Sequence, residues 1–373
     1  MDLDRHRETL DVYEGRAQDW QEQRPPRHDE ARAFTAEVAA DAGVPDGAVI
    51  DLGCGPGWHL PDLPPATIAV DGAAAMLDLV AEHRPGAPRI RADLRALPMR
   101  GGSCRAVWAN KSYVHLQRSL VPLALWDLHR AMALGGIAHI GVFGGDREHE
   151  GFDADDFAGR SFSLWPTELL EDVLVGAGFA IESIDEPDRD THRDEVPYLL
   201  ARIRRLRTLA DTVGPGMRLL VVGLNPSLHA ADSGVGFSGP GNRGWPALLA
   251  SGLADEHTER RPAALLQRRR IGMTDLAKRA TGKASELDPG EYRLGVQRLD
   301  RLCEWLQPQA VCVVGLTGWR AATDRSATAG LQERTLGGRP VWLMPNPSGL
   351  NAHTSLDDLA EHLRAAAALA ESA

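Results

Sequence analysis

The stretch Val221-Val222-Gly223-Leu224-Asn225-Pro226-Ser227 decides the fold of the C-terminal half of this 373-residue chain. It ends a short aliphatic run that starts at Met217, and such runs predict a buried strand. The Gly-Leu-Asn-Pro cluster turns the chain at the carboxyl end of that strand, the edge at which open parallel sheets bind ligands. A second run, Val341-Trp342-Leu343-Met344, leads in the same way into Pro345-Asn346-Pro347-Ser348. One Asn-Pro pair is commonly only a turn former, but two pairs after two strands predict a functional edge.

The rest of the C-terminal half alternates between helical and strand-like segments. We expect strand 217–224, a helix from about residue 244, helix 290–307, strand 310–315, helix 317–328, strand 340–344 and helix 355–370. This alternation predicts a three-layer α/β domain at 217–373 with a short parallel sheet. The segment 206–216 contains Gly214-Pro215-Gly216 and is typical of a linker.

Residues 1–205 carry a glycine-rich turn directly after a buried strand. The strand 48–52 runs into Gly53-Cys54-Gly55-Pro56-Gly57, where the glycines let the backbone approach a nucleotide-like cofactor closely. The next strand ends in Asp71, which is placed to accept both hydroxyls of a ribose. A third strand is followed by Asp93, an acid that can accept from an adenine amino group. The pattern predicts a Rossmann-like α/β domain.

Length and composition agree with two soluble domains. A chain of 373 residues exceeds one typical domain, and 43% hydrophobic and 25% charged residues are ordinary for globular protein. The N-terminus is not a signal peptide and no apolar stretch approaches membrane-spanning length, so we expect a cytoplasmic protein without membrane contact. The cysteines form no Cys-x-x-Cys pair, which argues against a metal centre or a disulfide framework. They are Cys54, Cys104, Cys303 and Cys312.

The net charge of −11 is unevenly distributed along the chain. From Arg207 onward there are 19 basic and 17 acidic residues, and the remainder contains 22 and 35. Only the N-terminal half is therefore strongly acidic. Arginine clusters at 260–261 and 268–270 are either phosphate contacts or solvated helix faces, and the sequence leaves both open.

The two Asn-Pro-Ser loops resemble the signature loops of the uracil-DNA glycosylase superfamily, in particular its mismatch-specific uracil/thymine-DNA glycosylases. Phe237, Asn242-Arg243-Gly244-Trp245 and Gly272-Met273-Thr274-Asp275-Leu276 are similar to further landmarks of that family in the same order. The resemblance implies a DNA partner and a role in base excision repair. It implies an enzyme that flips uracil, or a mismatched or damaged pyrimidine, out of the duplex and hydrolyses its N-glycosidic bond.

The same resemblance implies roles for individual residues. Asn225 positions the hydrolytic water, Asn346 donates to the departing base, and Phe237 stacks on the flipped base. Leu350, beside Ser348-Gly349, fills the gap left in the duplex. An amide at the Asn346 position donates more weakly than the His of the fastest superfamily members, so a slow enzyme is expected.

The N-terminal motifs resemble class I S-adenosylmethionine-dependent methyltransferases over residues 1–203. In that family the glycine loop holds the methionine part of the cofactor, one acid holds the ribose, and an Asp-Leu pair lies beside adenine. The matching positions here are Asp51, Gly53, Gly55, Gly57, Asp71, Asp93, Leu94 and Asn110. A nicotinamide cofactor is the alternative for the glycine loop, but the Gly-Cys-Gly-Pro-Gly form and the second acid favour S-adenosylmethionine.

The sequence does not name the methyl acceptor. Asn110-Lys111-Ser112-Tyr113 stands where DNA amino-methyltransferases carry Asn-Pro-Pro-Tyr, and both prolines are missing. The segment is more similar to the small-molecule subgroup. His115 is either a general base near the acceptor or, as is commoner for such histidines, a capping or packing residue.

We therefore predict a bifunctional enzyme in which a methyltransferase precedes a DNA glycosylase. In one alternative the C-terminal half binds lesions without cleaving them and targets the methyltransferase. In another the N-terminal half is a degenerate scaffold. Intact Asn225 argues against the first alternative, and the complete glycine loop with Asp71 and Asp93 argues against the second.

Overall fold

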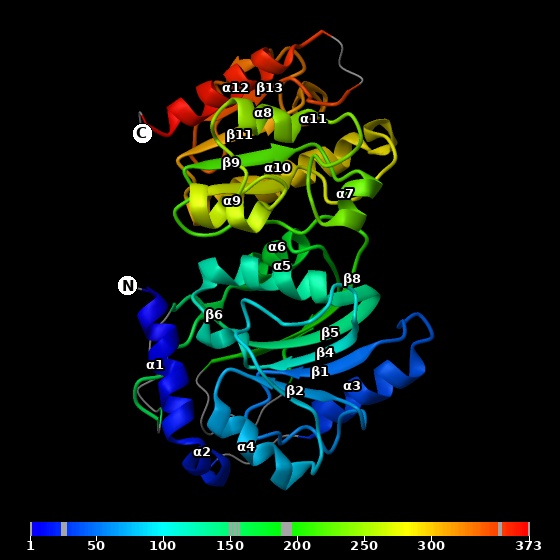
Figure 1. Ribbon diagram of the computed structural model, residues 1–373, viewed down its shortest axis with the longest axis vertical. Helices are drawn as coiled ribbons and strands as arrows, with labels where there is room; N and C mark the ends of the chain where they lie inside the picture. The colour runs from blue at the N-terminus through cyan, green and yellow to red at the C-terminus, as the bar shows by residue number, and fades with distance from the viewer. Residues whose placement is uncertain are drawn as a thin grey trace. The chain divides into compact units, whose positions relative to one another are not determined.

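The computed structural model describes residues 2–23, 28–148, 151, 155, 157–187, 196–349 and 353–371. The chain divides into two compact units, each with its own β-sheet between helices (Figure 1). The N-terminal unit comprises Met1–Leu174 with Phe179–Leu206, and the C-terminal unit comprises Val175–Gly178 with Arg207–Ala373. Both units have the α/β architecture that the sequence predicts.

The N-terminal unit is built on a sheet in the order β3-β2-β1-β4-β5-β8-β7, with β6 paired to β5. The strands are β1 (Ala48–Leu52), β2 (Ile68–Asp71), β3 (Arg89–Arg91), β4 (Cys104–Asn110), β5 (Met132–Gly144), β6 (Leu164–Trp165), β7 (Phe179–Asp185) and β8 (Tyr198–Arg205). The helices are α1 (Asp2–Gly15), α2 (Ala17–Gln23), α3 (Asp29–Ala40), α4 (Ala74–His83), α5 (Val121–Ala131) and α6 (Thr167–Gly176). The first five strands in this order run parallel, and β8 is antiparallel to both of its neighbours.

Helices cover the central strands of this sheet, and those strands are mostly apolar. Phe34 of α3 and Val80 of α4 belong to one core cluster with Val49, Ala69 and Trp108 of the strands. Figure 1 shows α5 on the opposite face of the sheet from α3 and α4. Parallel strands buried on both faces lack the polar alternation of half-exposed strands. Because β1, β2, β3 and β4 run parallel, the residues that follow them share one edge of the sheet.

The C-terminal unit has a five-stranded sheet in the order β10-β9-β11-β13-β12. The strands are β9 (Leu219–Gly223), β10 (Ile271–Asp275), β11 (Ala310–Val314), β12 (Gly330–Leu331) and β13 (Val341–Met344). The helices are α7 (Leu228–Ser233), α8 (Gly244–Ala250), α9 (Pro262–Arg269), α10 (Pro289–Leu306), α11 (Leu316–Ala322) and α12 (Leu356–Leu369). Four strands run parallel, and only the short edge strand β12 is antiparallel.

Helices on both faces complete three layers in this unit. Trp245 of α8, Leu265 of α9 and Leu363 of α12 lie in one core cluster on the sheet. On the other face of the sheet, Gly318 of α11 lies against Leu224, which follows β9, and against Tyr292 of α10. Helix α10 starts at a capping box in which Asp288 accepts from the backbone N–H of Gly290 and Pro289 occupies the first turn.

Two segments differ from the sequence-based expectation. Helix α11 ends at Ala322 rather than near 328, because Thr323 turns back onto the carbonyl oxygen of Trp319 (2.8 Å). The segment expected as a linker is packed into the C-terminal unit over much of its length. Asp211 is 3% exposed, and Thr212 pairs with Met273 through two backbone hydrogen bonds of 2.9 Å.

Candidate functional sites at the carboxyl ends of the strands

The glycine loop after β1 forms a cradle that side chains would fill. A Cβ atom on Gly53 would overlap the Cβ of Ser112, and the backbone φ of Gly53 is 72°. Gly55 has a φ of 54°, and no atom lies within 4 Å of the position its Cβ would take. Its N–H donates to Asp71 Oδ2 at 2.9 Å. The loop therefore presents open backbone beside a carboxylate, a shape that suits a cofactor.

Two carboxyl groups border this cradle, the half-buried Asp71 and the buried Asp51. Asp71 accepts from Gly55 and, through Oδ1, from the N–H of Ala73 at 2.9 Å. Burial raises the pKa of Asp71. Asp51 is 1% exposed, and its Oδ2 has no hydrogen-bond partner among the described residues. Burial and the neighbouring Asp71 raise the pKa of Asp51 to about 8. A carboxyl group left unsatisfied at a glycine cradle is suited to a polar or cationic ligand group.

The acid expected beside adenine is engaged by its own neighbour. Asp93 is gripped by the Arg95 side chain, with Nε 2.9 Å from Oδ1 and Nη2 2.6 Å from Oδ2. Burial alone would raise the pKa of Asp93, but hydrogen bonds from Arg95 lower it. Leu94, the residue between Asp93 and Arg95 in the sequence, is half-buried. At the end of β4, Asn110 Oδ1 accepts from the Tyr198 hydroxyl at 2.8 Å. Asp51 lies one residue before the end of β1, the glycine loop follows β1, and Asp71 and Asn110 end β2 and β4.

His115 is hydrogen-bonded at both ring nitrogens. Nδ1 lies 2.9 Å from the carbonyl oxygen of Ser161, which can only accept, so Nδ1 carries the proton. Nε2 then accepts from the Tyr13 hydroxyl at 2.8 Å, and Arg160 Nη1 donates to that hydroxyl at 3.0 Å. This arrangement matches the packing interpretation of His115. Tyr13 is 102 residues away in the chain, so the pair could not be predicted from local sequence.

In the C-terminal unit, the loop after β10 fixes the side-chain amide of Asn225. Nδ2 donates to Thr281 Oγ1 at 2.8 Å and to the carbonyl oxygen of Arg279 at 3.0 Å. Thr281 Oγ1 donates in turn to the carbonyl oxygen of Lys283 at 3.0 Å, so it acts as an acceptor toward Asn225. These bonds assign the orientation of the amide. No described residue donates to Asn225 Oδ1, so this oxygen is an acceptor at the sheet edge.

The second Asn-Pro-Ser loop lies at the same edge. Strands β9 and β13 both run parallel to β11, which separates them. Asn346 Oδ1 accepts from the N–H of Ser348 at 3.0 Å. This bond assigns the orientation of the amide, with Oδ1 toward Ser348 and the donor Nδ2 on the other side. The carbonyl oxygen of Pro347 accepts from the N–H of Arg243 at 2.9 Å, which joins this loop to the segment before α8.

Phe237 sits between two glycines that leave room for its ring. A Cβ on Gly244 would lie 2.6 Å from Phe237 Cβ, and one on Gly223 would lie 3.5 Å from Phe237 Cζ. The Phe237 backbone has a φ of 54°, in the left-handed region. The half-buried ring packs against the core cluster that contains Trp245. Gly223 precedes Asn225 by two residues, so the aromatic ring and the Asn225 loop belong to one site.

The remaining predicted residues of this site are only partly visible. Leu350 lies outside the described residues, so its role as a wedge stays a prediction. Gly349 before it is exposed, and a Cβ there would lie 2.9 Å from the carbonyl oxygen of Gly241. Ser227 caps α7 by accepting from the N–H of Ala230 at 3.1 Å.

A buried charge cluster lies on the other side of β10. Asp211 accepts from Lys278 Nζ at 2.7 Å, from Arg298 Nη1 at 2.8 Å and from Thr274 Oγ1 at 2.6 Å. Burial alone would raise the pKa of Asp211, but Lys278 and Arg298 hold it below its usual range. Asp275, the last residue of β10, is also buried, and Oδ2 of its carboxyl group has no partner among the described residues. No sequence motif indicates a role for the side chains of Asp211, Thr281 or Asp275.

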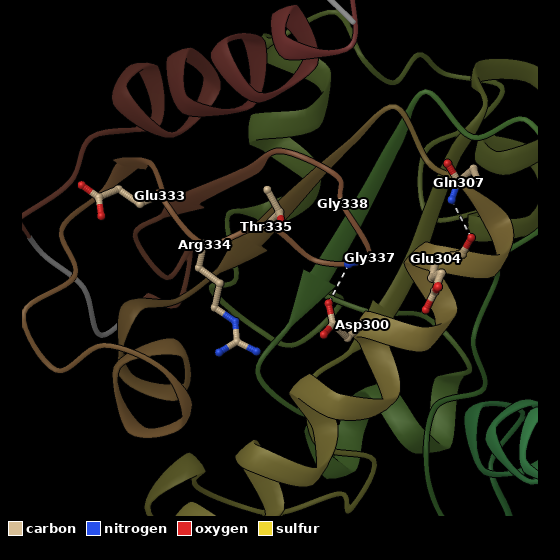
Figure 2. Close-up of a pocket in the computed structure, with 8 residues that line it drawn as sticks. All are labelled: Asp300, Glu304, Gln307, Glu333, Arg334, Thr335, Gly337 and Gly338. Atoms are coloured by element: carbon tan, nitrogen blue, oxygen red, sulfur yellow. Dashed lines mark hydrogen bonds between the residues drawn. The ribbon is translucent and has the colours of Figure 1, made fainter.

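A polar cavity of about 760 Å³ occupies a different part of the C-terminal unit (Figure 2). It is lined by Asp300, Glu304, Gln307, Glu333, Arg334, Thr335, Gly337 and Gly338. Gln307 comes just before β11, and Gly337-Gly338 come just before β13. The cavity is therefore at the amino ends of these strands, whereas Asn225 and Asn346 follow carboxyl ends. Ligands of parallel sheets bind at carboxyl ends, so we assign this cavity no catalytic role.

The arginine cluster 268–270 lies at the amino end of β10 for the same topological reason. Arg269 pairs with Asp255, and Arg270 Nε donates to the carbonyl oxygen of Gly216 at 2.5 Å. This cluster is therefore remote from the Asn225 edge, and of its two interpretations the structure favours a helix end with local partners. Among the described residues, no helix combines the length and apolarity needed to cross a bilayer.

Comparison with known proteins agrees with this division of the chain. A family model described as the uracil DNA glycosylase superfamily matches residues 210–370, and one described as a methyltransferase domain matches residues 49–136. Similar solved structures include an S-adenosylmethionine-dependent methyltransferase from Mesorhizobium loti, with 21% identity and a TM-score of 0.36. That match covers 48% of this chain and 99% of the other. A Burkholderia thailandensis 1,6-didemethyltoxoflavin-N1-methyltransferase matches with 17% identity and a TM-score of 0.40, over 54% and 87% of the two chains. The two family matches identify this chain as a methyltransferase domain joined to a domain of the uracil-DNA glycosylase superfamily.

Proposed function

We propose that the C-terminal unit removes uracil from DNA by hydrolysing the N-glycosidic bond of a flipped nucleotide, and that mismatched thymine and related damaged pyrimidines are further candidate substrates. The N-terminal unit transfers a methyl group from S-adenosylmethionine to an acceptor that the sequence does not name. The protein is thus a bifunctional enzyme that acts on DNA through its second half.

The orientation of the Asn225 amide carries the glycosylase proposal. Its Nδ2 is committed to Thr281 and to the backbone of Arg279. Its Oδ1 therefore accepts a hydrogen bond from water, and this holds the water without deprotonating it. Such a water attacks the anomeric carbon as the bond to the base breaks and the sugar gains positive charge. An amide is sufficient for this task when the base departs largely unaided.

The other loops contact the flipped base and the gap that it leaves in the duplex. Phe237 offers a ring for the flipped base to stack on, and Asn346 offers Nδ2 donors to the oxygens of the departing base, which gain negative charge. Leu350 fills the space that the base leaves in the duplex. Phe237 lies on a different loop from Asn346 and Leu350, so base stacking can be tested separately from the other two functions.

The N-terminal cradle fits S-adenosylmethionine in shape and in charge. Gly53, Gly55 and Gly57 allow close approach, Asp71 has acceptor capacity left for ribose hydroxyls, and the unpaired Oδ2 of Asp51 suits the methionine ammonium. The bound cofactor would supply an electrophilic methyl group. The chain's own contribution is to bind and orient it, with Asp93 available to adenine once the Arg95 contact opens.

The test of the glycosylase proposal is single-turnover excision of uracil from a uracil·guanine duplex by the full-length protein and by Asn225→Ala. We expect the variant to lose excision and to keep most of its affinity for uracil-containing DNA, because phosphate contacts, Phe237 and Leu350 remain. Leu350→Ala should show the reverse profile, with weaker specific binding.

A melting curve beside each assay separates the two explanations of Asn225. If it only shapes a turn, Asn225→Ala lowers stability and leaves the excision rate per folded molecule unchanged. A wild-type protein that binds uracil·guanine DNA specifically and never cleaves it would support the lesion-binding alternative instead.

A further inference from the structure

Arg243 contacts the second Asn-Pro-Ser loop at two places, and the scheme above does not use this residue. Its backbone N–H donates to the carbonyl oxygen of Pro347 at 2.9 Å. Its side chain reaches further, and Nη1 donates to the carbonyl oxygen of Thr354 at 2.6 Å. These two acceptors lie near the two ends of the loop between β13 and α12. One residue therefore holds both ends of this loop, and its side chain supplies one of the two bonds.

The far end of the loop is also tied to a helix. Thr354 directly precedes Ser355, the N-cap of α12. Ser355 Oγ accepts from the N–H of Asp358 at 3.1 Å, and Asp358 Oδ2 accepts from the N–H of Ser355 at 2.9 Å. Such a capping box fixes the first turn of a helix. The Arg243 side chain therefore links its own segment to a well-defined helix start.

On its other side, the segment that contains Arg243 is fixed to the Phe237 loop. The buried indole of Trp245 donates to the carbonyl oxygen of Gly236 at 2.8 Å. A Cβ atom on Gly244 would lie 2.6 Å from Phe237 Cβ, so the two backbones are in close contact. The segment thus joins the loop of the proposed stacking ring to the second Asn-Pro-Ser loop.

We propose that Arg243 is a positioning residue that sets the spacing between the Phe237 ring and the loop after β13 before DNA binds. This inference rests on the proposed glycosylase function. That loop contains Leu350, and filling the vacated space in the duplex stabilises an extrahelical base. A loop that is held at both ends loses less conformational freedom on binding, which favours the flipped state. Arg243 acts through the loop and touches neither the base nor the reacting atoms.

The competing explanation of Arg243 is a phosphate contact, because arginine commonly binds phosphates in DNA complexes. The two explanations predict different results. A phosphate contact adds to the affinity for every duplex, with or without uracil, and makes that affinity more dependent on salt. A positioning contact affects only the complexes in which a base has left the duplex.

The experiment compares the full-length wild type with Arg243→Ala, Arg243→Lys and the control Arg334→Ala. Arg334 is an exposed arginine at the cavity of Figure 2, so its replacement removes the same side chain and charge away from the Asn225 edge. The first readout is single-turnover excision from two duplexes. One has uracil opposite guanine, and the other has uracil opposite a tetrahydrofuran abasic analogue, where it is unpaired.

Two binding readouts do not depend on catalysis. One is the fluorescence of 2-aminopurine placed beside non-cleavable 2′-fluoro-2′-deoxyuridine, which rises when the neighbouring base leaves the stack. The other is the affinity for an undamaged duplex between about 50 and 200 mM salt. The undamaged duplex also reports whether each variant is folded and binds DNA.

Arg243→Ala should excise uracil from the uracil·guanine duplex about tenfold more slowly than wild type, because a charged hydrogen bond is lost. It should show a smaller 2-aminopurine signal at saturation. On the duplex with the abasic analogue its rate should stay within about twofold of wild type, because an unpaired uracil leaves the stack more easily. Its affinity for undamaged DNA and its salt dependence should not change. Arg243→Lys keeps a donor for the Thr354 carbonyl oxygen and should recover most of the rate, and Arg334→Ala should match wild type throughout.

Four results would overturn the assignment. If Arg243→Ala matches wild type on both uracil duplexes, the loop is held without this side chain, and the glycosylase proposal stands. If the variant binds undamaged DNA more weakly, with a salt slope smaller by about one, Arg243 is a phosphate contact. If excision falls equally on both uracil duplexes, Arg243 affects the chemical step or the fold instead of base flipping. If wild type neither excises uracil nor raises the 2-aminopurine signal, the glycosylase proposal fails and the Arg243 assignment fails with it.

Discussion

Thr281 Oγ1 lies 2.8 Å from Asn225 Nδ2 and accepts its hydrogen bond. The two residues are 56 positions apart, on loops that follow the neighbouring strands β9 and β10. A backbone bridge between Ser227 and Thr281 ties the same loops together. Because the contact uses the donor of the amide, it determines that the Asn225 oxygen faces the proposed water. Thr281 is therefore a positioning residue.

Thr281→Val should lower the single-turnover excision rate about tenfold. The Asn225 amide loses a hydrogen bond worth about 1.4 kcal/mol and can then rotate away from the water. Affinity for uracil-containing DNA should stay near that of wild type. Thr281→Ser keeps the hydroxyl and should retain most of the rate. Equal rates for Thr281→Val and wild type would show that Asn225 is held without this contact.

The Asp211 cluster predicts where the glycosylase domain can be separated from the rest of the chain. A fragment starting at Arg207 includes Asp211 and should fold and excise uracil. A fragment starting at Gly214 leaves Lys278 and Arg298 buried without their carboxylate, which should cost about 3–5 kcal/mol of stability. Circular dichroism melts of the two fragments make the comparison, and equal melting temperatures would contradict the role given to Asp211.

Asp71→Ala should weaken S-adenosylmethionine binding about 10- to 100-fold. The change removes an acceptor for ribose hydroxyls and also frees the N–H of Gly55, and lost contacts of this kind cost about 1–3 kcal/mol. Isothermal titration calorimetry on the full-length protein measures the effect. Asp78→Ala, at an exposed position of α4, is the control that should bind like wild type. If both variants bind equally well, the acid after β2 does not hold the cofactor.

Asp275→Asn should change the pH dependence of stability. The pKa of Asp275 is about 6 in the folded protein, against an ordinary value near 4 in the unfolded chain. The folded state therefore holds the proton more tightly, and stability is lost as the pH rises from about 4 to about 6. At pH 8 the loss is on the order of 1–3 kcal/mol, and the Asn variant should not show it.

Urea melts of both proteins at about pH 4 and pH 8 test this expectation. The two free energies of unfolding should be similar at the lower pH, and Asp275→Asn should be the more stable at the higher one. A variant less stable than wild type at pH 8 would indicate that the carboxylate has a stabilising partner.

Local sequence was enough to place the strands and the loops that end them. Asn225 and Asn346 were expected at one sheet edge because each comes after an apolar run and directly before a proline, and parallel pairing with β11 puts them there. The acids around the glycine loop were found for the same reason. A motif that directly follows a predicted strand can be placed from local sequence, because the end of the strand determines the edge of the sheet at which the motif lies.

Residues whose meaning depends on distant partners were not predictable in this way. Gly214-Pro215-Gly216 suggested a linker by composition, yet the nearby Asp211 is bound to Lys278 and Arg298, 67 and 87 positions away. Thr274 and Asp275 adjoin in the sequence but face opposite sides of β10. Asp211 is paired, whereas Oδ2 of Asp275 has no hydrogen-bond partner among the described residues, and only the two faces of the folded sheet explain this difference.

Phe237 combines a left-handed backbone with a ring confined between Gly223 and Gly244. Such a backbone is unfavourable for a residue with a side chain by roughly 1–2 kcal/mol, so the surrounding structure must hold it. In the proposed glycosylase reaction, the ring is therefore already in place before DNA arrives, and no rearrangement of the aromatic side chain slows capture of a base. The association rate for an extrahelical nucleotide should then follow how often the damaged pair opens by itself. Weakly paired lesions would be captured sooner than intact pairs, even before any atom of the base is inspected.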